Sequence, residues 1–263
     1  MKIVASIVLA LIALVLLWNV TATSTPQAPT MATSTSIVAA SASTTVPAVI
    51  PTSPVHTSAH TSVANKVATP EYRTALTCAQ KVSSDVCSAS QKAAAAQVMS
   101  IGKNPSDLEA WIELGVARKD AGDYVGAASA WNYVSALDPS NVVSFNNLGD
   151  LYMSYLHEYP KAVASYMQEI RNNPHGLDAY KNIFQIYTTT AYTGSATAAA
   201  DILKQGIAAN PKAVDLQVIL ARYYKAHGDR ADAQATYLAA ISNAQSQGKS
   251  SLVTQLQAES AGQ

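Results

Sequence analysis

The sequence is poor in charge, and the shortage is uneven. Its 263 residues hold 17 basic and 17 acidic side chains, only 13% of the chain. Before residue 71 the only charged side chains are Lys2 and Lys66, so all the others lie in residues 71–263. A net charge of zero excludes a strongly basic surface, and we therefore expect no nucleic-acid partner.

The motifs of the common enzyme classes are missing as well. No GxxxxGK, GxSxG or HExxH occurs, and there is no glycine-rich dinucleotide turn. His56 and His60 lie four residues apart in a segment where no helix is expected, and no carboxylate or cysteine joins them. We therefore expect no enzymatic activity, no cofactor and no metal site.

One long hydrophobic run is present, at the start of the chain. Residues 3–17 contain only Ser6 as a polar residue, and Lys2 precedes them, which is typical of an export signal. Extended to Val20, the run spans roughly 27 Å as a helix, against a hydrocarbon core of roughly 30 Å. Residues 1–22 therefore fit either a signal peptide cleaved after Ala22 or an uncleaved anchor with a transmembrane helix at about residues 3–20.

The following residues, 23–70, form the second segment of the predicted organisation. Residues 21–70 hold 20 Ser or Thr, 10 Ala and 6 Pro, with no aromatic residue and Lys66 as the only charge. Such a composition buries too little apolar surface to fold, so it predicts a disordered linker. A spacer is useful when one end is held in a membrane, which favours the anchor with the remaining domain outside the cytoplasm, periplasmic or on the cell surface. The alternative is a secreted protein.

Residues 71–263 carry an internal repeat. Prolines 105, 139, 174 and 211 each follow Asn or Asp, at spacings of 34, 35 and 37 residues. Proline ends one helix and is tolerated in the first turn of the next, so each marks a junction between helices. Two helical stretches fit between successive prolines. Small residues mark where the two helices approach each other, at 115, 149 and 221 in the first helix and at 127, 162, 199 and 233 in the second.

The run WIELG…AASAW…DP with its 34-residue period resembles the tetratricopeptide repeat (TPR). The resemblance implies an all-α fold, a right-handed α-solenoid of antiparallel helix pairs. The units fall at about residues 108–141, 142–176, 177–213 and 214–247. A degenerate unit is expected at about 71–107, and a capping helix at about 250–259. The third unit departs from the pattern because Phe184 replaces the small residue and extra residues lengthen the loop around 188–197.

Cys78 and Cys87 are the only cysteines. An extracytoplasmic location favours a disulfide, whereas two free thiols are the alternative. In one continuous helix the two residues would lie roughly 13 Å apart, beyond bonding reach, so a bond requires a turn between them. Residues 83–85 are the predicted turn.

The resemblance also implies a function, a groove of first helices that binds an extended peptide or a partner helix. The groove-facing positions carried over to this sequence are Ile112, Val116, Lys119, Asn146, Asp150, Met153, Lys181, Gln185, Thr188, Val218, Arg222 and Lys225. Asn146 and Gln185 suit a peptide backbone, while Lys181 and Arg222 suit a carboxylate. The sequence thus predicts a non-enzymatic scaffold tethered to a membrane, with a protein or peptide partner. The alternative is a structural envelope or stalk component without a specific ligand.

Overall fold

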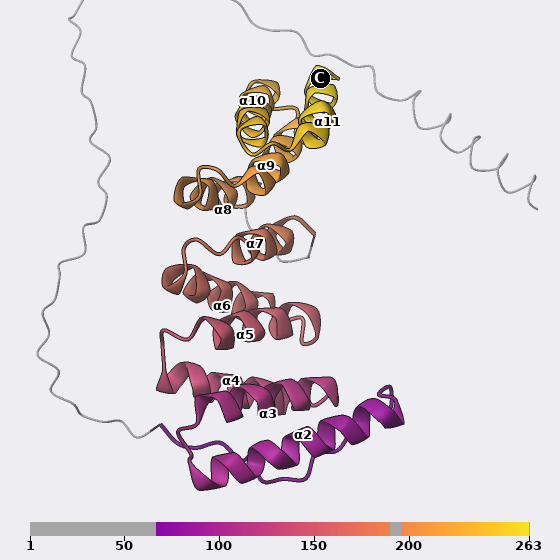
Figure 1. Cartoon of the computed structure of the whole chain (residues 1–263), viewed down its shortest axis with the longest axis vertical. Coiled ribbons are helices and arrows are strands. Elements are labelled where there is room, and N and C mark those ends of the chain that lie inside the picture. Colours follow the sequence, from indigo (N-terminus) through magenta and orange to yellow (C-terminus); the bar gives the residue numbers. More distant parts are fainter. Residues whose placement is uncertain (1–66, 190–195, 263) are drawn as a thin grey trace, which may run out of the picture. The chain divides into compact units, whose positions relative to one another are not determined.

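The computed structural model describes residues 67–189 and 196–262, all of which belong to one compact unit, Ser62–Gln263. The predicted signal or anchor lies outside the described residues, as does the linker up to residue 66. In the described part every regular element is a helix, and there is no strand (Figure 1). Its helices are α2 (Ser84–Lys103), α3 (Leu108–Asp120), α4 (Tyr124–Leu137), α5 (Val142–Ser154), α6 (Tyr159–Asn172), α7 (Asp178–Thr189), α8 (Ala196–Ala209), α9 (Val214–Ala226), α10 (Arg230–Ser246) and α11 (Ser250–Ala261).

Four antiparallel pairs, α3–α4, α5–α6, α7–α8 and α9–α10, correspond to the four predicted units. Each second helix packs on the first helix of the next pair, so the pairs stack in chain order (Figure 1). The described helices thus form the predicted α-solenoid of antiparallel pairs. The cores merge along the stack because no single pair can bury its own apolar face.

The close approaches within the pairs are formed by the predicted small residues. A methyl group added to Gly115 would lie 2.6 Å from Trp131 Cε2, and one on Gly149 would lie 2.6 Å from Tyr166 Cδ1. The Trp131 ring is held in place because its Nε1 donates to the carbonyl of Ile112 at 3.0 Å. Large rings on the second helices therefore fill the space that the glycines leave.

The third unit replaces this contact, as its sequence suggests. Phe184 is half-buried and packs edge-on against Tyr223, with ring centroids 5.4 Å apart. The tight approach moves to the second helix, where a methyl on Gly206 would meet Leu216 Cδ1 at 2.7 Å and Tyr180 at 2.9 Å. Helix α7 ends at Thr189, and the predicted long loop lies mainly in 190–195, outside the described residues.

The proline junctions are tied together by side-chain donors. Near the start of three first helices, a side chain donates to the proline carbonyl six residues earlier: Trp111 to Pro105 at 2.9 Å, Tyr180 to Pro174 at 3.0 Å and Gln217 to Pro211 at 3.1 Å. An asparagine of the following unit donates to the same kind of carbonyl: Asn172 to Pro139 at 2.9 Å, Asn210 to Pro174 at 3.1 Å and Asn243 to Pro211 at 2.9 Å. In the second unit Phe145 occupies the donor position and has nothing to donate.

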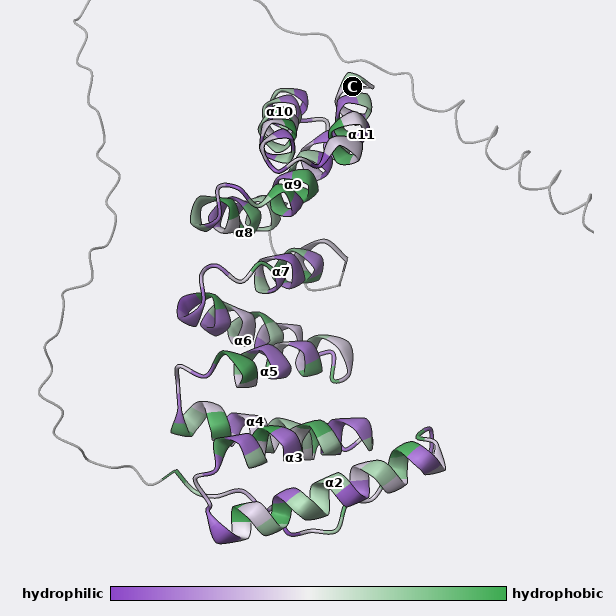
Figure 2. Cartoon of the chain, in the orientation of Figure 1, coloured by the Kyte–Doolittle hydropathy of each residue, from purple (hydrophilic) through white to green (hydrophobic). Residues whose placement is uncertain are grey.

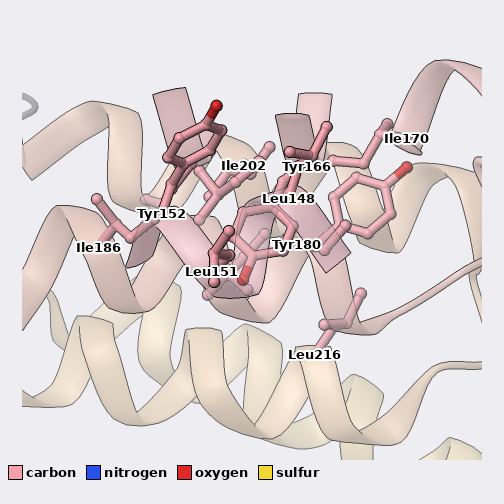
Figure 3. Close-up of a cluster of buried hydrophobic side chains, with 14 of the residues drawn as sticks. Leu148, Leu151, Tyr152, Tyr166, Ile170, Tyr180, Ile186, Ile202 and Leu216 are labelled. Atoms are coloured by element: carbon pink, nitrogen blue, oxygen red, sulfur yellow. The ribbon is translucent and has the colours of Figure 1, made fainter. Parts of the chain in front are cut away.

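The core is apolar and continuous across several units. Its largest cluster joins side chains of α4 to α10, and Figure 3 shows part of it around Leu148, Leu151, Tyr166 and Tyr180. Figure 2 shows hydrophobic and hydrophilic residues mixed along most helices, as expected when each helix buries one face and exposes another.

The N-terminal unit differs from the prediction. Residues 67–82 contain no helix, so the unit expected at 71–107 has a single helix, α2, and lacks a first one. The segment 67–82, which we call the strap, lies against α2 and α3 instead. Tyr72 packs edge-on against Trp111 at 5.2 Å, and Gln91 Nε2 donates to the carbonyl of Leu76 at 3.0 Å. Apolar residues recur in this segment at helical spacing, at Tyr72, Leu76, Ala79 and Val82, so the absence of a helix does not follow from the local pattern.

Cys78 and Cys87 form a disulfide, with Cα atoms 5.8 Å apart, that joins the end of the strap to the first turn of α2. The predicted turn at 83–85 is wrong. The chain turns at residues 80–82, where the amide of Val82 donates to the carbonyl of Ala79 at 2.9 Å. Ser83 is instead the N-cap of α2, accepting from the amide of Val86, because serine hydroxyls stabilise helix starts.

The C-terminal end carries the expected capping helix, α11, which packs on α10 through Leu256. Polar side chains such as Thr254 and Gln257 are exposed on its outer face. No helix of the described part is both long and apolar enough to cross a membrane.

Candidate functional site

The predicted groove positions lie on one face of each first helix, which we call the first-helix face. Residues four and seven apart share a side of a helix, so α3, α5, α7 and α9 each contribute one turn-spaced set. Two predicted members of this face are not accessible to a ligand. Ile112 and Val218 are buried in the core, Ile112 with the α3–α4 cluster and Val218 against α10, because these positions also close the helix pair. Asp150, Gln185, Thr188 and Arg222 are exposed.

The polar centre of the face lies between α5 and α7. The Asp150 carboxylate accepts from Tyr166 Oη at 2.6 Å and from Asn182 Nδ2 at 3.4 Å. Asn146 Nδ2 donates to Glu169 Oε2 at 3.3 Å. Asp150 therefore links three helices: α5, which carries it, α6 through the tyrosine and α7 through Asn182.

This centre is acidic and partly desolvated. The Glu169 residue is 6% exposed, and burial raises the pKa of its carboxyl. Within the described residues no lysine, arginine or histidine forms an ion pair with it. Burial, followed by the hydrogen bond to Asp150, also raises the pKa of Tyr166, so its hydroxyl stays a donor to that carboxylate throughout the neutral range.

The α7 part of the face is more open. Lys181 forms an ion pair with Asp178 at 2.5 Å, one turn earlier on the same helix. Gln185 is exposed one turn later. Its backbone carbonyl accepts from the hydroxyls of Thr188 and Thr189, which end the helix. Lys181 is held only by a surface pair, and such pairs exchange partners at little cost.

The α9 part is occupied by the chain itself. Arg222 Nε and Nη2 donate to the two carboxylate oxygens of Glu259 on α11 at 2.9 and 2.8 Å. Lys225 Nζ donates to the backbone carbonyl of Glu259 at 2.6 Å. The bond from Arg222 lowers the pKa of Glu259 to about 2. The predicted carboxylate ligand of Arg222 thus has an internal counterpart, the last helix.

The predicted site residues do not form one cluster. Asn146 and Asp150 belong to the α5–α6–α7 network, Lys181 and Gln185 lie along α7, and Arg222 is tied to α11. Sequence reasoning missed Asn182, Glu169 and Glu259. The available signal for Glu169 was an acidic residue placed between Tyr166 and Ile170 on the packed face of a second helix.

The described residues contain no group of three or more His, Cys, Asp or Glu side chains arranged to hold a metal ion. His56 and His60 lie outside the described residues. The chemistry that the first-helix face offers is hydrogen bonding and charge pairing.

No family model matches the sequence, and no curated protein matches it. Among solved structures, the chain is similar to a crystal structure of MamA, with 19% identity over 59% of this chain and 88% of that one, at a TM-score of 0.48. It is also similar to YrrB, described as a TPR protein with an unusual peptide-binding site, with 14% identity over 56% and 74% at a TM-score of 0.44. A thermophilic TPR protein from Thermus thermophilus shares 20% identity over 63% and 86%, at a TM-score of 0.39.

Proposed function

We propose that this chain is a non-enzymatic protein-interaction scaffold that binds a peptide or a partner helix on its first-helix face. The observation that carries the proposal is the polar network of α5–α7. There, exposed Asp150 is held by Tyr166 and Asn182, so its carboxylate has a defined position before any ligand arrives. Preorganised polar groups lose less entropy on binding than mobile ones.

The open part of the face supplies adaptable contacts. Gln185 offers a donor and an acceptor to a peptide backbone, and Lys181 offers an ammonium group that only a surface ion pair holds. Arg222 has a smaller role in this proposal than its position suggests, because α11 already supplies its carboxylate. The ligand-binding stretch therefore runs over α5 and α7.

The proposal places the repeat domain outside the cytoplasm, tethered through residues 3–20. Two features support it. The N-terminal run reads as an export segment, and a disulfide is most stable in an oxidising compartment. The secreted alternative differs only in that the chain is cleaved after Ala22. Sequencing the N-terminus of the native protein separates the two, since a mature chain starting at Thr23 contradicts the tether.

The ligand proposal is tested by crosslinking the native protein and identifying the captured partners by mass spectrometry. The variant Lys181→Glu/Gln185→Arg changes two side chains of α7, whereas Gln234→Arg/Lys249→Glu makes the same changes elsewhere on the solenoid. We expect the first variant to lose partners that the second keeps. If both variants capture the same partners as the unaltered chain, the first-helix face is not the binding surface and a structural role without a specific ligand is favoured.

A further inference from the structure

The strap encloses a hollow together with α2 and α3. In Figure 1 the strap is the indigo coil that runs alongside α2. The hollow has a volume of about 320 Å³ and is lined by residues 72–76 of the strap and by side chains of the two helices. This volume lies at the lower end of the range of small-molecule sites, roughly 300–1,000 Å³. Because the strap already covers one side, the hollow fits a small molecule rather than a helix or strand of a partner.

Most of the lining is apolar. Ala94, Ala95 and Val98 of α2 contribute to it, together with Leu114 of α3 and Leu76 of the strap. Ala94 and Leu114 are buried, and Leu76 and Val98 are half-buried. The two alanines leave space that larger side chains would fill. An apolar group that enters this space is removed from water, which favours its binding.

The wall that the strap forms is fixed at three points. Gln91 Nε2 on α2 donates to the carbonyl of Leu76 at 3.0 Å. The amide of Ala79 donates at 2.8 Å to the carbonyl of Ala121, the C-cap of α3. The disulfide ties the end of the strap to the first turn of α2. The hollow is therefore formed before a ligand arrives, which lowers the entropy cost of binding.

A buried cation, Arg118 of α3, also lines the hollow. The residue is 8% exposed. It departs from the repeat, because the equivalent position of the other three units is a tyrosine, Tyr152, Tyr187 and Tyr224. Its Nη1 donates to Asp123 at 2.6 Å, and its Nη2 donates to the carbonyl of Tyr72 on the strap at 3.4 Å. A guanidinium has five N–H donors, more than these two acceptors use.

The charged side chains that line the hollow are both basic. The second is Arg73, whose Nε donates to the hydroxyl of Tyr72 at 3.2 Å and whose Cζ lies 5.2 Å from the centre of that ring. Asp123 compensates the charge of Arg118, and Glu71 accepts from the backbone amide of Arg73. Neither carboxylate is among the lining residues. The lining therefore carries positive charge without negative charge, which favours an anion.

We propose that this hollow binds a small carboxylic acid with an apolar body. The body lies against Ala94, Ala95 and Leu114, and the carboxylate accepts hydrogen bonds from the guanidinium groups of Arg73 and Arg118. Guanidinium groups suit this role because they form short, charge-assisted hydrogen bonds with carboxylates. The site is separate from the first-helix face of α5 and α7 and does not depend on it.

The test uses the full chain and octanoate as the probe, with octylamine and butyrate for comparison. Hydrogen–deuterium exchange with mass spectrometry follows the amides of residues 72–76, which a ligand in the hollow should protect. Ala95→Phe fills the hollow with a ring, and Ala96→Phe is the matched control at the next position, which is also exposed and lies outside the lining. Arg73→Gln removes a charge of the lining, and Lys92→Gln makes the same change outside it. All four positions are exposed, so the fold is kept, and circular dichroism verifies it.

We expect octanoate to protect residues 72–76 with a saturable dose response. The half-saturating concentration should rise at least about tenfold in Ala95→Phe and stay unchanged in Ala96→Phe. Arg73→Gln should raise it about three- to tenfold, whereas Lys92→Gln should leave it unchanged. Octylamine should need at least about a tenfold higher concentration because its charge is opposite. Butyrate, which lacks four of the methylene groups, should also need at least about a tenfold higher concentration.

The outcomes separate the parts of the proposal. If octanoate gives no saturable protection, protects Ala95→Phe as well as the unaltered chain, or protects all the helices evenly, the hollow is not its site. If octylamine protects as well as octanoate, or Arg73→Gln responds like the unaltered chain, the preference for a carboxylate is wrong. The first-helix proposal is tested by captured partners, so the two proposals fail independently.

Discussion

The tight contact between the helices of the first pair makes one substitution diagnostic. Gly115→Ala adds a methyl group 2.6 Å from Trp131 Cε2, and the indole cannot move away without stretching its bond to the carbonyl of Ile112. Overpacking of this kind costs about 1–3 kcal/mol, and weakening the hydrogen bond adds about 1 kcal/mol. The higher helix propensity of alanine offsets about 1 kcal/mol of this loss. We expect a net loss of about 2 kcal/mol of unfolding free energy.

Gly102→Ala is the matched control, because it makes the same chemical change within α2 where nothing lies within 4 Å of the new methyl group. Because there is no clash, only the higher helix propensity of alanine acts, and we expect the unfolding free energy to rise by about 0.5–1 kcal/mol. Urea unfolding followed by circular dichroism measures both. With a urea slope of about 2 kcal/mol/M, the midpoint should fall by about 1 M for Gly115→Ala and rise slightly for Gly102→Ala.

A double-mutant cycle isolates the contact. In a Trp131→Leu background the ring that obstructs the methyl group is absent, so Gly115→Ala should lose most of its penalty. If Gly115→Ala stabilises the chain as Gly102→Ala does, or if its penalty is the same with leucine at 131, the two helices do not approach each other as described.

Three further predictions concern the junctions and the ends. Phe145→Tyr should raise the unfolding free energy by about 0.5–1.5 kcal/mol in urea titration, because its hydroxyl can donate to the Pro139 carbonyl as Tyr180 does to Pro174; a loss of stability would show that the geometry of the second unit differs. Reducing the disulfide should remove at most about 3 kcal/mol, and hydrogen exchange should rise in residues 78–90 while α5–α10 keep their protection; uniform loss of protection would contradict a local role. The pKa of Glu259 is lowered to about 2. The stabilisation that its carboxylate contributes is therefore complete above the usual carboxyl pKa and is lost as the pH falls from there to about 2. Because the pair with Arg222 is partly exposed, we expect about 1 kcal/mol, seen as faster exchange in α11 between pH 5 and pH 2. Glu259→Gln should remove this pH dependence, and an unchanged pH profile would refute the assignment.

The regular part of the fold was predictable from sequence because its signals are local. The spacing of the prolines gives the length of the repeat. Each close helix–helix contact pairs a glycine of the first helix with an aromatic ring of the second, Gly115 with Trp131 and Gly149 with Tyr166. The strap was not predictable in this way. Its contacts, such as Tyr72 with Trp111, join residues far apart in sequence, and its apolar residues recur at helical spacing although no helix forms there.

The positions of the first-helix face were predictable from sequence, but the contacts that its residues already make within the chain were not. Helical spacing places Asn146, Asp150, Lys181 and Arg222 on their helices, yet no local pattern shows that Glu259 lies 37 residues beyond Arg222 and binds it. A helix position that looks open within one unit is closed by a segment that arrives later in the chain.

The disulfide also determines how the solenoid bears mechanical load. A pull on the chain through residue 66 acts first on the strap, and we expect its contacts with α2 and α3, such as those of Tyr72 and Leu76, to break one after another. At Cys78 the peeling stops, because the sulfur bridge passes the tension directly to Cys87 in the first turn of α2. The residues between the two cysteines then carry no load. Under tension the strap can therefore extend up to Cys78, and any further extension requires the helices to unfold.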